Sequence, residues 1–133
     1  MIYLDTHVVA WLYAGRVDLL PSLVRTLVDG NELLMSPMVG LELQYLHEIG
    51  KTTDPADAVI NTLSAAIGLR FCDLAFAEVS RASWAETWTR DPFDRIIVAQ
   101  ARLRGEPLIT RDRTIRRRYA RALWDRPRGA TPG

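Results

Sequence analysis

Cysteine, histidine and lysine are scarce in this chain. Cys72 is its only cysteine, so neither an internal disulfide nor a cysteine-based zinc site can form. The two histidines, His7 and His47, stand apart in the sequence, which disfavours a zinc centre and leaves no visible Ser-His-Asp triad. Lys51 is the only lysine, so arginine supplies nearly every positive charge. The lack of cysteine pairs favours a reduced, cytoplasmic setting.

Long apolar runs are missing as well. No stretch approaches the ~18–20 apolar residues that cross a bilayer, and no signal peptide is recognisable, so we expect no membrane partner. With 133 residues, 48% hydrophobic and 25% charged, the chain is predicted to form one domain over 1–133, with a flexible tail at about 126–133. The net charge of +1 excludes no class of partner. Eight arginines against two aspartates in 111–128 fit a solvated face and a phosphate-binding face equally well.

Short strand-like runs alternate with helix-like runs along the chain. Prolines preceded by Ser36, Asp54 and Asp91 mark helix starts, and glycines mark helix ends. We predict strands at 1–4, 31–35, 69–74, 107–110 and 121–124, and helices at 7–15, 21–30, 36–50, 55–68, 75–86, 91–105 and 113–120. Such alternation predicts βαβ units and a mainly parallel sheet with helices on both faces. In these α/β folds, sites form at the carboxyl ends of the strands.

Four acidic residues are expected at that edge of the sheet. Asp5 directly follows one strand and Asp112 comes two residues after another, and each precedes a helix. Asp94 lies in the first turn of its helix, on the face that carries the apolar residues, behind Asp91 as the predicted N-cap. Helix capping explains Asp5 or Asp112 alone. Capping does not explain why the same arrangement recurs at distant places in the chain.

Glu42 stands on an apolar face of its predicted helix. Its neighbours at helical spacing are Met38, Val39, Tyr45, Leu46 and Ile49. An ionised carboxylate buried on such a face is costly without a cation or a hydrogen-bond donor. The alternative is that Glu42 lies at the rim of the face and reaches water. Carboxylates gathered together repel one another or share a cation, and Mg²⁺ prefers such oxygen ligands. We therefore predict a metal site in which Asp5 is a ligand.

The chain resembles the PIN-domain ribonucleases, and specifically the VapC-type toxins of bacterial toxin–antitoxin pairs. The resemblance covers nearly the whole chain and lies in "LDTHVVAWLYAG", "SPMVGLELQYL", "DPFDRIIVAQA" and "PLITRDRTI". It implies a three-layer α/β/α sandwich, endoribonuclease activity with Mg²⁺ or Mn²⁺, a homodimer and a cognate antitoxin. It also implies catalytic and supporting residues. The catalytic set is Asp5, Glu42, Asp94 and Asp112, and the supporting set is Thr6, Asp91 and Thr110.

Within that hypothesis, Asp5, Asp94 and Asp112 are the metal ligands, and Glu42 either ligates or orients the attacking water. Arginines next to the acidic motifs are candidates for holding the RNA backbone, because guanidinium groups match phosphate oxygens. These candidates are Arg95, Arg111 and Arg113. Tyr45, Trp84 and Trp88 receive no role, since aromatic residues at helical spacing more often belong to the core.

Two other functions compete with the nuclease. A receiver-type signalling domain also gathers acids at a sheet edge, but it needs a lysine at a late strand end, and Lys51 lies elsewhere. A catalytically silent PIN-like module would bind RNA or a protein without cutting. The complete acidic set argues against this second alternative, which metal-dependent cleavage would exclude.

Overall fold

A single five-stranded sheet lies at the centre of the molecule. The computed structural model describes residues 1–125, and the predicted tail at 126–133 lies outside the described residues. The strand order is β3-β2-β1-β4-β5, and every pairing is parallel, which confirms the predicted parallel sheet. The strands are β1 (Ile2–Leu4), β2 (Leu33–Met35), β3 (Arg70–Phe71), β4 (Leu108–Ile109) and β5 (Ala122–Leu123).

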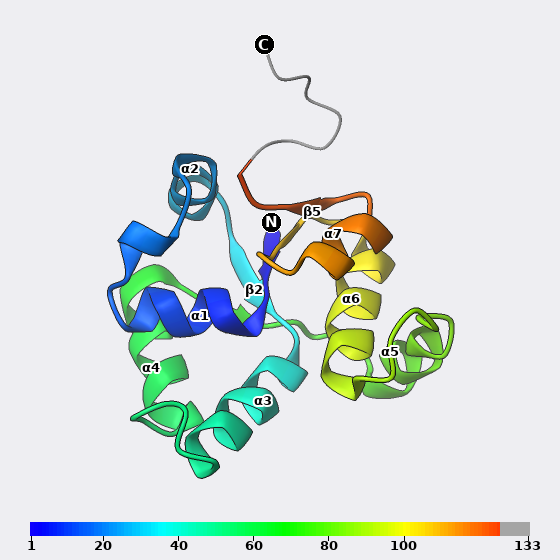
Figure 1. The fold of residues 1–133 in the computed structure, drawn as a ribbon, viewed down its shortest axis with the longest axis horizontal. Helices are drawn as coiled ribbons and strands as arrows, with labels where there is room; N and C mark the ends of the chain where they lie inside the picture. Colours follow the sequence, from blue (N-terminus) through cyan, green and yellow to red (C-terminus); the bar gives the residue numbers. More distant parts are fainter. Residues whose placement is uncertain (126–133) are drawn as a thin grey trace.

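Helices cover both faces of this sheet. In the described residues they are α1 (Thr6–Tyr13), α2 (Ser22–Gly30), α3 (Pro37–Glu48), α4 (Ala56–Ile67), α5 (Phe76–Ser83), α6 (Pro92–Arg104) and α7 (Arg113–Arg118). Helices α1, α2 and α4 lie on one side, and α5, α6 and α7 lie on the other (Figure 1). The fold is therefore the predicted three-layer α/β/α sandwich. A short 3₁₀ turn at Val17–Leu19 was not predicted.

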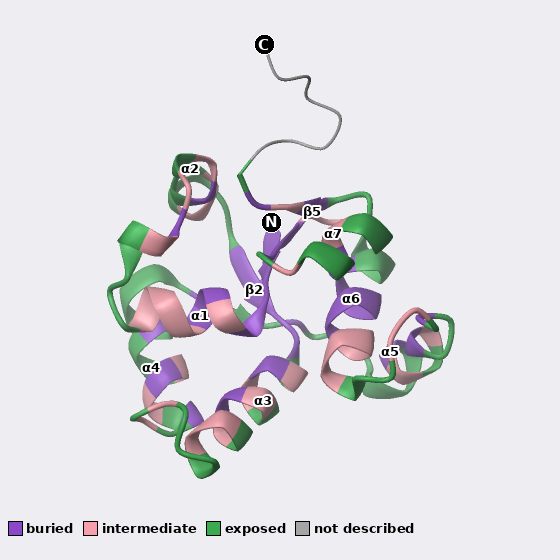
Figure 2. Cartoon of the chain, viewed as in Figure 1, coloured by how far each residue is buried: buried purple, intermediate pink, exposed green. Residues whose placement is uncertain are grey.

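The core is built on the central strand, β1, and its two neighbours, β2 and β4. All residues of β1 and β2 are buried, whereas the outer sides of the helices are exposed (Figure 2). Strands buried on both faces carry continuous apolar side chains, which is why "IYL" and "LLM" do not alternate with polar residues. Pairing of Leu4 with Ile109 places Asp5 beside Thr110 at the carboxyl edge of the sheet. The Asp5 N–H continues the ladder by donating to the Ile109 carbonyl at 3.0 Å.

Helix boundaries agree with the expected caps in two of three cases. The Ser36 hydroxyl accepts from the Met38 N–H at 3.1 Å, and the Asp91 carboxylate accepts from the Phe93 N–H at 2.8 Å. The third expectation is wrong, because Pro55 is the N-cap of α4 and the Ala56 N–H donates to Gln44 Oε1 of α3 at 3.1 Å. Asp54 instead accepts a hydrogen bond from the Tyr13 hydroxyl, which ties the loop before α4 to α1.

The predicted inward face of α3 is only partly correct. Val39 and Leu43 form the buried line of this helix, whereas Tyr45 is 49% exposed and Ile49 is 48% exposed. Helix α3 packs on α1, α4 and α6, and the Tyr45 ring lies 6.1 Å from that of Phe93 on α6. Trp84, at the end of α5, is also exposed rather than part of the core. No helix in residues 1–125 has the length and apolar character that would let it span a membrane.

Candidate active site

Asp5 lies at the end of the central strand, where it is 4% exposed. Its Oδ1 accepts the Thr6 N–H at 2.8 Å, which makes it the N-cap of α1. Its Oδ2 accepts the hydroxyl of Thr110, which follows β4, at 2.6 Å. Capping and site formation are therefore compatible, because each oxygen of this carboxylate has a different neighbour.

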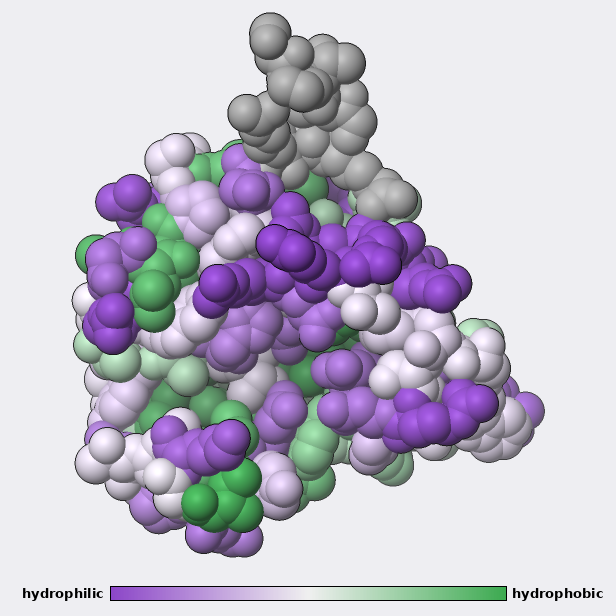
Figure 3. Space-filling view, viewed as in Figure 1, coloured by the Kyte–Doolittle hydropathy of each residue, from purple (hydrophilic) through white to green (hydrophobic). Residues whose placement is uncertain are grey.

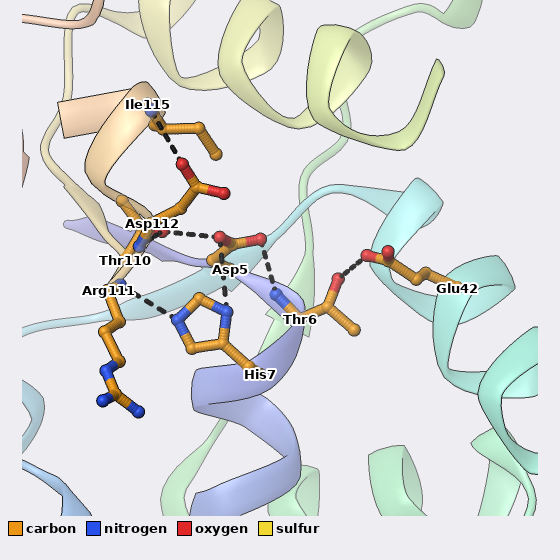
Figure 4. A network of polar contacts seen from close by, with 8 residues as sticks. All are labelled: Asp5, Thr6, His7, Glu42, Thr110, Arg111, Asp112 and Ile115. Atoms are coloured by element: carbon orange, nitrogen blue, oxygen red, sulfur yellow. Dashed lines mark hydrogen bonds and ion pairs between the residues drawn. The ribbon is translucent and has the colours of Figure 1, made fainter. Parts of the chain in front are cut away.

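Thr110 connects two of the acids. Besides donating to Asp5, its Oγ1 accepts the Asp112 N–H at 3.0 Å. Asp112 is the N-cap of α7 and accepts the Ile115 N–H at 2.9 Å. Figure 4 shows Asp112 and Asp5 side by side above the ends of β4 and β1. The fully buried Thr110 side chain thus holds the Asp5 carboxylate and the backbone of Asp112.

The other acids come from α3 and from the start of α6. Glu42 is half-buried and accepts a hydrogen bond from the Thr6 hydroxyl (Figure 4). Asp91 caps α6 through the Phe93 and Asp94 N–H groups. Asp94 follows one turn into the helix, and its carboxylate accepts no hydrogen bond from any residue in 1–125. It is the acid with the fewest constraints.

These side chains converge on one pocket of about 280 Å³. Its polar lining is Asp5, Thr6, His7, Glu42, Asp91, Asp94 and Asp112. The structure thereby brings together all four predicted catalytic acids and two supporting residues, while Thr110 lies beneath them. No arginine or lysine lines this pocket within the described chain. The carboxylates of this pocket therefore face one another without a cationic side chain of residues 1–125 between them.

The electrostatic consequence is largest at Asp94. Burial, followed by the charges of Asp91, Asp5, Asp112 and Glu42, raises the pKa of Asp94 from 3.8 to about 7. This carboxyl group therefore keeps its proton to a higher pH than an ordinary aspartate does. The repulsion would be relieved by a bound cation, which favours the ionised carboxylate.

Glu42 is perturbed in the same direction. Burial raises its pKa, and the charges of Asp5 and Asp91 raise it further, whereas the hydrogen bond from Thr6 partly opposes them. A carboxylate of raised pKa beside a polar pocket is suited to accept a proton from water. The Thr6 hydroxyl holds one of its oxygens in place at the pocket.

His7 was not predicted to belong to the site. Its Nε2 accepts the Arg111 N–H at 2.9 Å, and its Nδ1 lies 3.6 Å from Asp5 Oδ2 (Figure 4). A ring nitrogen that accepts an N–H carries no proton, so the imidazole is neutral with its proton on the side of Asp5. Burial lowers the pKa of His7, against the charges of Asp5 and Asp112. Its place in the first turn after Asp5 was the only sequence signal.

The predicted arginines divide into two groups. Arg111 and Arg113 line a second pocket, of about 600 Å³, that shares His7 and Asp112 with the acidic pocket. Arg95 lines neither pocket, because its Nε donates to the Thr89 carbonyl at 2.8 Å. Hydrophilic side chains gather over α7 and the adjoining start of α1 (Figure 3). Arg111 and Arg113 therefore border the acidic pocket.

The ligand atoms available in this pocket fit a hard divalent cation. They are carboxylate oxygens, and no cysteine of the described chain lines the pocket. The His7 nitrogen nearest to Asp5 carries a proton and so cannot bind a metal. Across residues 1–125, no three acidic, histidine or cysteine side chains already stand in a ligating arrangement. An ion that keeps several of its waters, as Mg²⁺ does, suits such a site better than one that requires a complete protein cage.

Comparisons with known proteins agree with this architecture. The family model described as PIN domain matches residues 2–121. The VapBC2 complex of Rickettsia felis, solved with a promoter DNA fragment, is similar at 19% identity and a TM-score of 0.64, over 88% of this chain and 92% of that chain. VapBC-1 of nontypeable Haemophilus influenzae is similar at 20% identity and a TM-score of 0.52, over 89% and 92%. At these identities the likeness is one of fold. No curated protein sequence matches the chain significantly.

Proposed function

The chain belongs to the PIN-domain family, and from that premise we propose that it is a Mg²⁺- or Mn²⁺-dependent endoribonuclease, the toxin of a VapC-type toxin–antitoxin pair. The observation that carries the proposal is the convergence of Asp5, Glu42, Asp94 and Asp112 in one pocket. These acids come from four separate segments, and burial together with the neighbouring negative charges raises the pKa of Asp94 to about 7. Such a cluster is unfavourable for the protein alone and useful for holding a cation.

In this mechanism Asp5, Asp94 and Asp112 hold the ion. When bound, the ion would lower the pKa of water and offset the charge on the leaving oxygen of a phosphodiester. Thr110 keeps Asp5 and Asp112 in place through its two hydrogen bonds. Asp91 supports Asp94 by capping the turn that carries it.

Glu42 acts as the general base for the attacking water. Its raised pKa makes it a better proton acceptor than an ordinary glutamate, while Thr6 fixes its orientation. Arg111 and Arg113 would hold phosphate oxygens of the RNA next to the acids. We do not extend this role to Arg95, whose Nε is committed to a backbone carbonyl.

The proposed partners are an RNA substrate, a cognate antitoxin and a second copy of the chain. The two similar structures are toxin–antitoxin complexes, which supports the antitoxin. For the homodimer, the support is an exposed apolar side of α3, where Leu41 is 58% exposed one turn from Tyr45. We place the protein in the cytoplasm, where its single buried thiol, Cys72, would stay reduced.

The test is cleavage of a cellular RNA pool by purified protein free of antitoxin. We expect discrete fragments with Mg²⁺ or Mn²⁺, and intact RNA with a chelator or with the Asp94→Asn variant. The matched control is Asp57→Asn, which changes an exposed aspartate in the first turn of α4 and should cut at the wild-type rate. Cleavage by Asp94→Asn at the wild-type rate would refute the assignment of this pocket.

Intact RNA in every lane, from a folded protein, would favour the silent binding module. The receiver-type alternative has lost its basis, because the chain belongs to the PIN-domain family and Lys51 does not line the acidic pocket.

A further inference from the structure

We propose that the second pocket binds one unpaired RNA nucleotide adjacent to the cut phosphate, with its base against an aromatic wall. This inference rests on the proposed function, since it assumes that RNA enters the acidic pocket. The wall consists of His7, Trp11 and Trp124, which lie on α1 and just after β5. No motif in the sequence joins these residues, because β5 reaches α1 only through the strand order of the sheet.

The three rings form a packed cluster. The centroid of His7 lies 5.1 Å from that of Trp11 and 6.2 Å from that of Trp124, in edge-to-face geometry. The Trp11 and Trp124 centroids are 5.9 Å apart. Trp124 is buried and Trp11 is half-buried, so the cluster is anchored in the protein while part of it faces the pocket. A fixed aromatic surface stacks with a base at little cost in side-chain order.

Charge around this wall matches a phosphate backbone. The Arg111 guanidinium lies 5.8 Å from the centroid of Trp11, and Arg113 and Arg116 line the same pocket. Guanidinium planes stack on bases and bind phosphate oxygens, so Arg111 can contact both parts of one nucleotide. Arg116 pairs with Asp125 at 2.8 Å, which fixes the far rim of the pocket.

Because the second pocket adjoins the acidic pocket, the nucleotide that it binds would be the one next to the cut phosphate. His7 and Asp112 line both pockets, so a chain whose phosphate lies at Asp112 would place its neighbouring nucleotide at the aromatic wall. The pocket, at about 600 Å³, lies within the size range of small-ligand sites and is large enough for a base. Aromatic stacking with arginine at its rim is the usual chemistry of single-stranded RNA binding.

The test measures RNA binding without cleavage, in an Asp94→Asn background. The probe is a short, fluorescein-labelled, single-stranded RNA of mixed sequence, together with versions that each lack one base. We expect Trp11→Ala to weaken binding roughly 5- to 150-fold, as stacking on one base implies, and Trp11→Phe to retain most of it. The matched control is Trp84→Ala. The Arg81 guanidinium lies 5.1 Å from the centroid of the Trp84 ring, but Trp84 lies at the end of α5 and does not line the second pocket.

The base-deleted RNAs keep the test decisive even if Trp11→Ala folds poorly. With Trp11 intact, one base position should matter more than its neighbours, and RNA lacking that base should bind Trp11 and Trp11→Phe proteins equally. Equal binding of every base-deleted RNA, or unchanged binding by folded Trp11→Ala, would overturn the subsite and leave the pocket to a protein partner. Metal-dependent cleavage together with unchanged Trp11→Ala binding would refute the subsite alone. Base-dependent binding by a protein that never cleaves would refute the nuclease and uphold the subsite.

Discussion

Replacing Asp94 with asparagine should stabilise the metal-free protein while it abolishes cleavage. The physical reason is the burial of this side chain, followed by the charges of the carboxylates around it, which raise its pKa from 3.8 to about 7. Because the folded chain holds a proton that the unfolded chain releases, the free energy of unfolding falls as pH rises through that interval. Asparagine carries no charge and removes this penalty.

The size of the effect follows from the shift. A pKa change from 3.8 to about 7 corresponds to about 4 kcal/mol at full strength. Asp94 is only half-buried at the edge of an open pocket, so solvent screening reduces this to about 1–2 kcal/mol. Asparagine also loses the favourable interaction of a charged group with the first turn of α6, about 0.3–1 kcal/mol. The expected net gain is therefore about 1 kcal/mol above the folded pKa.

The assay is urea unfolding of both proteins in chelator at about pH 5 and pH 8, with the slope m checked for constancy. We expect the gain of Asp94→Asn to be larger at pH 8, where wild-type Asp94 is mostly ionised. In the control Asp57→Asn, a first-turn aspartate of α4 without acidic crowding, only the dipole interaction is lost, so stability should fall slightly at both pH values.

Excess Mg²⁺ should reverse the order, because the wild-type protein gains binding free energy that the variant lacks. If Asp94→Asn in chelator is no more stable than wild type at pH 8, burial and repulsion at this pocket do not destabilise the ionised carboxylate as inferred. The metal assignment would then lose its electrostatic basis, whatever the cleavage assay gives.

Three further predictions address other parts of the site and surface. Thr110→Val should lower the free energy of unfolding by about 1–3 kcal/mol and reduce cleavage, because Asp5 and the Asp112 N–H both lose a buried hydrogen-bond partner. Urea unfolding and RNA cleavage test this, and a variant that matches the wild-type protein in both would contradict it. Adding Mg²⁺ should raise the melting temperature of the wild-type protein with the logarithm of its concentration, and calorimetry that finds no shift would argue against a resident ion. Leu41→Asp, on the exposed side of α3 near Tyr45, should convert the proposed dimer to monomer in light scattering; a dimer that survives must use another surface.

Local chemistry explains why so much of the fold could be predicted. Ser36 and Asp91 before prolines are helix-start signals that act within one turn, and both form the expected caps. The continuous apolar runs at 1–4 and 31–35 are typical of strands buried on both faces. Asp54 stands in the same local pattern, but its carboxylate bonds to Tyr13 instead, because a distant hydroxyl competes with the local backbone.

The acidic pocket was predictable because strand ends in a parallel sheet share one edge. Asp5 and Asp112 each follow a strand, so the topology alone brings them together. Tyr45 and Ile49 were misplaced for the opposite reason: helical spacing indicates which residues share a face, but not whether another element covers that face.

The sequence by itself determined the strands, the helices and the acids at their ends, since these depend on neighbours along the chain and on the edge shared by parallel strands. Only the tertiary structure decided that His7 contacts Arg111 across 104 positions, and that Trp11 and Trp124 form one wall. Those contacts depend on β4 lying beside β1 and on β5 lying beside β4, and periodicity in the sequence does not indicate which side chains meet across such a distance.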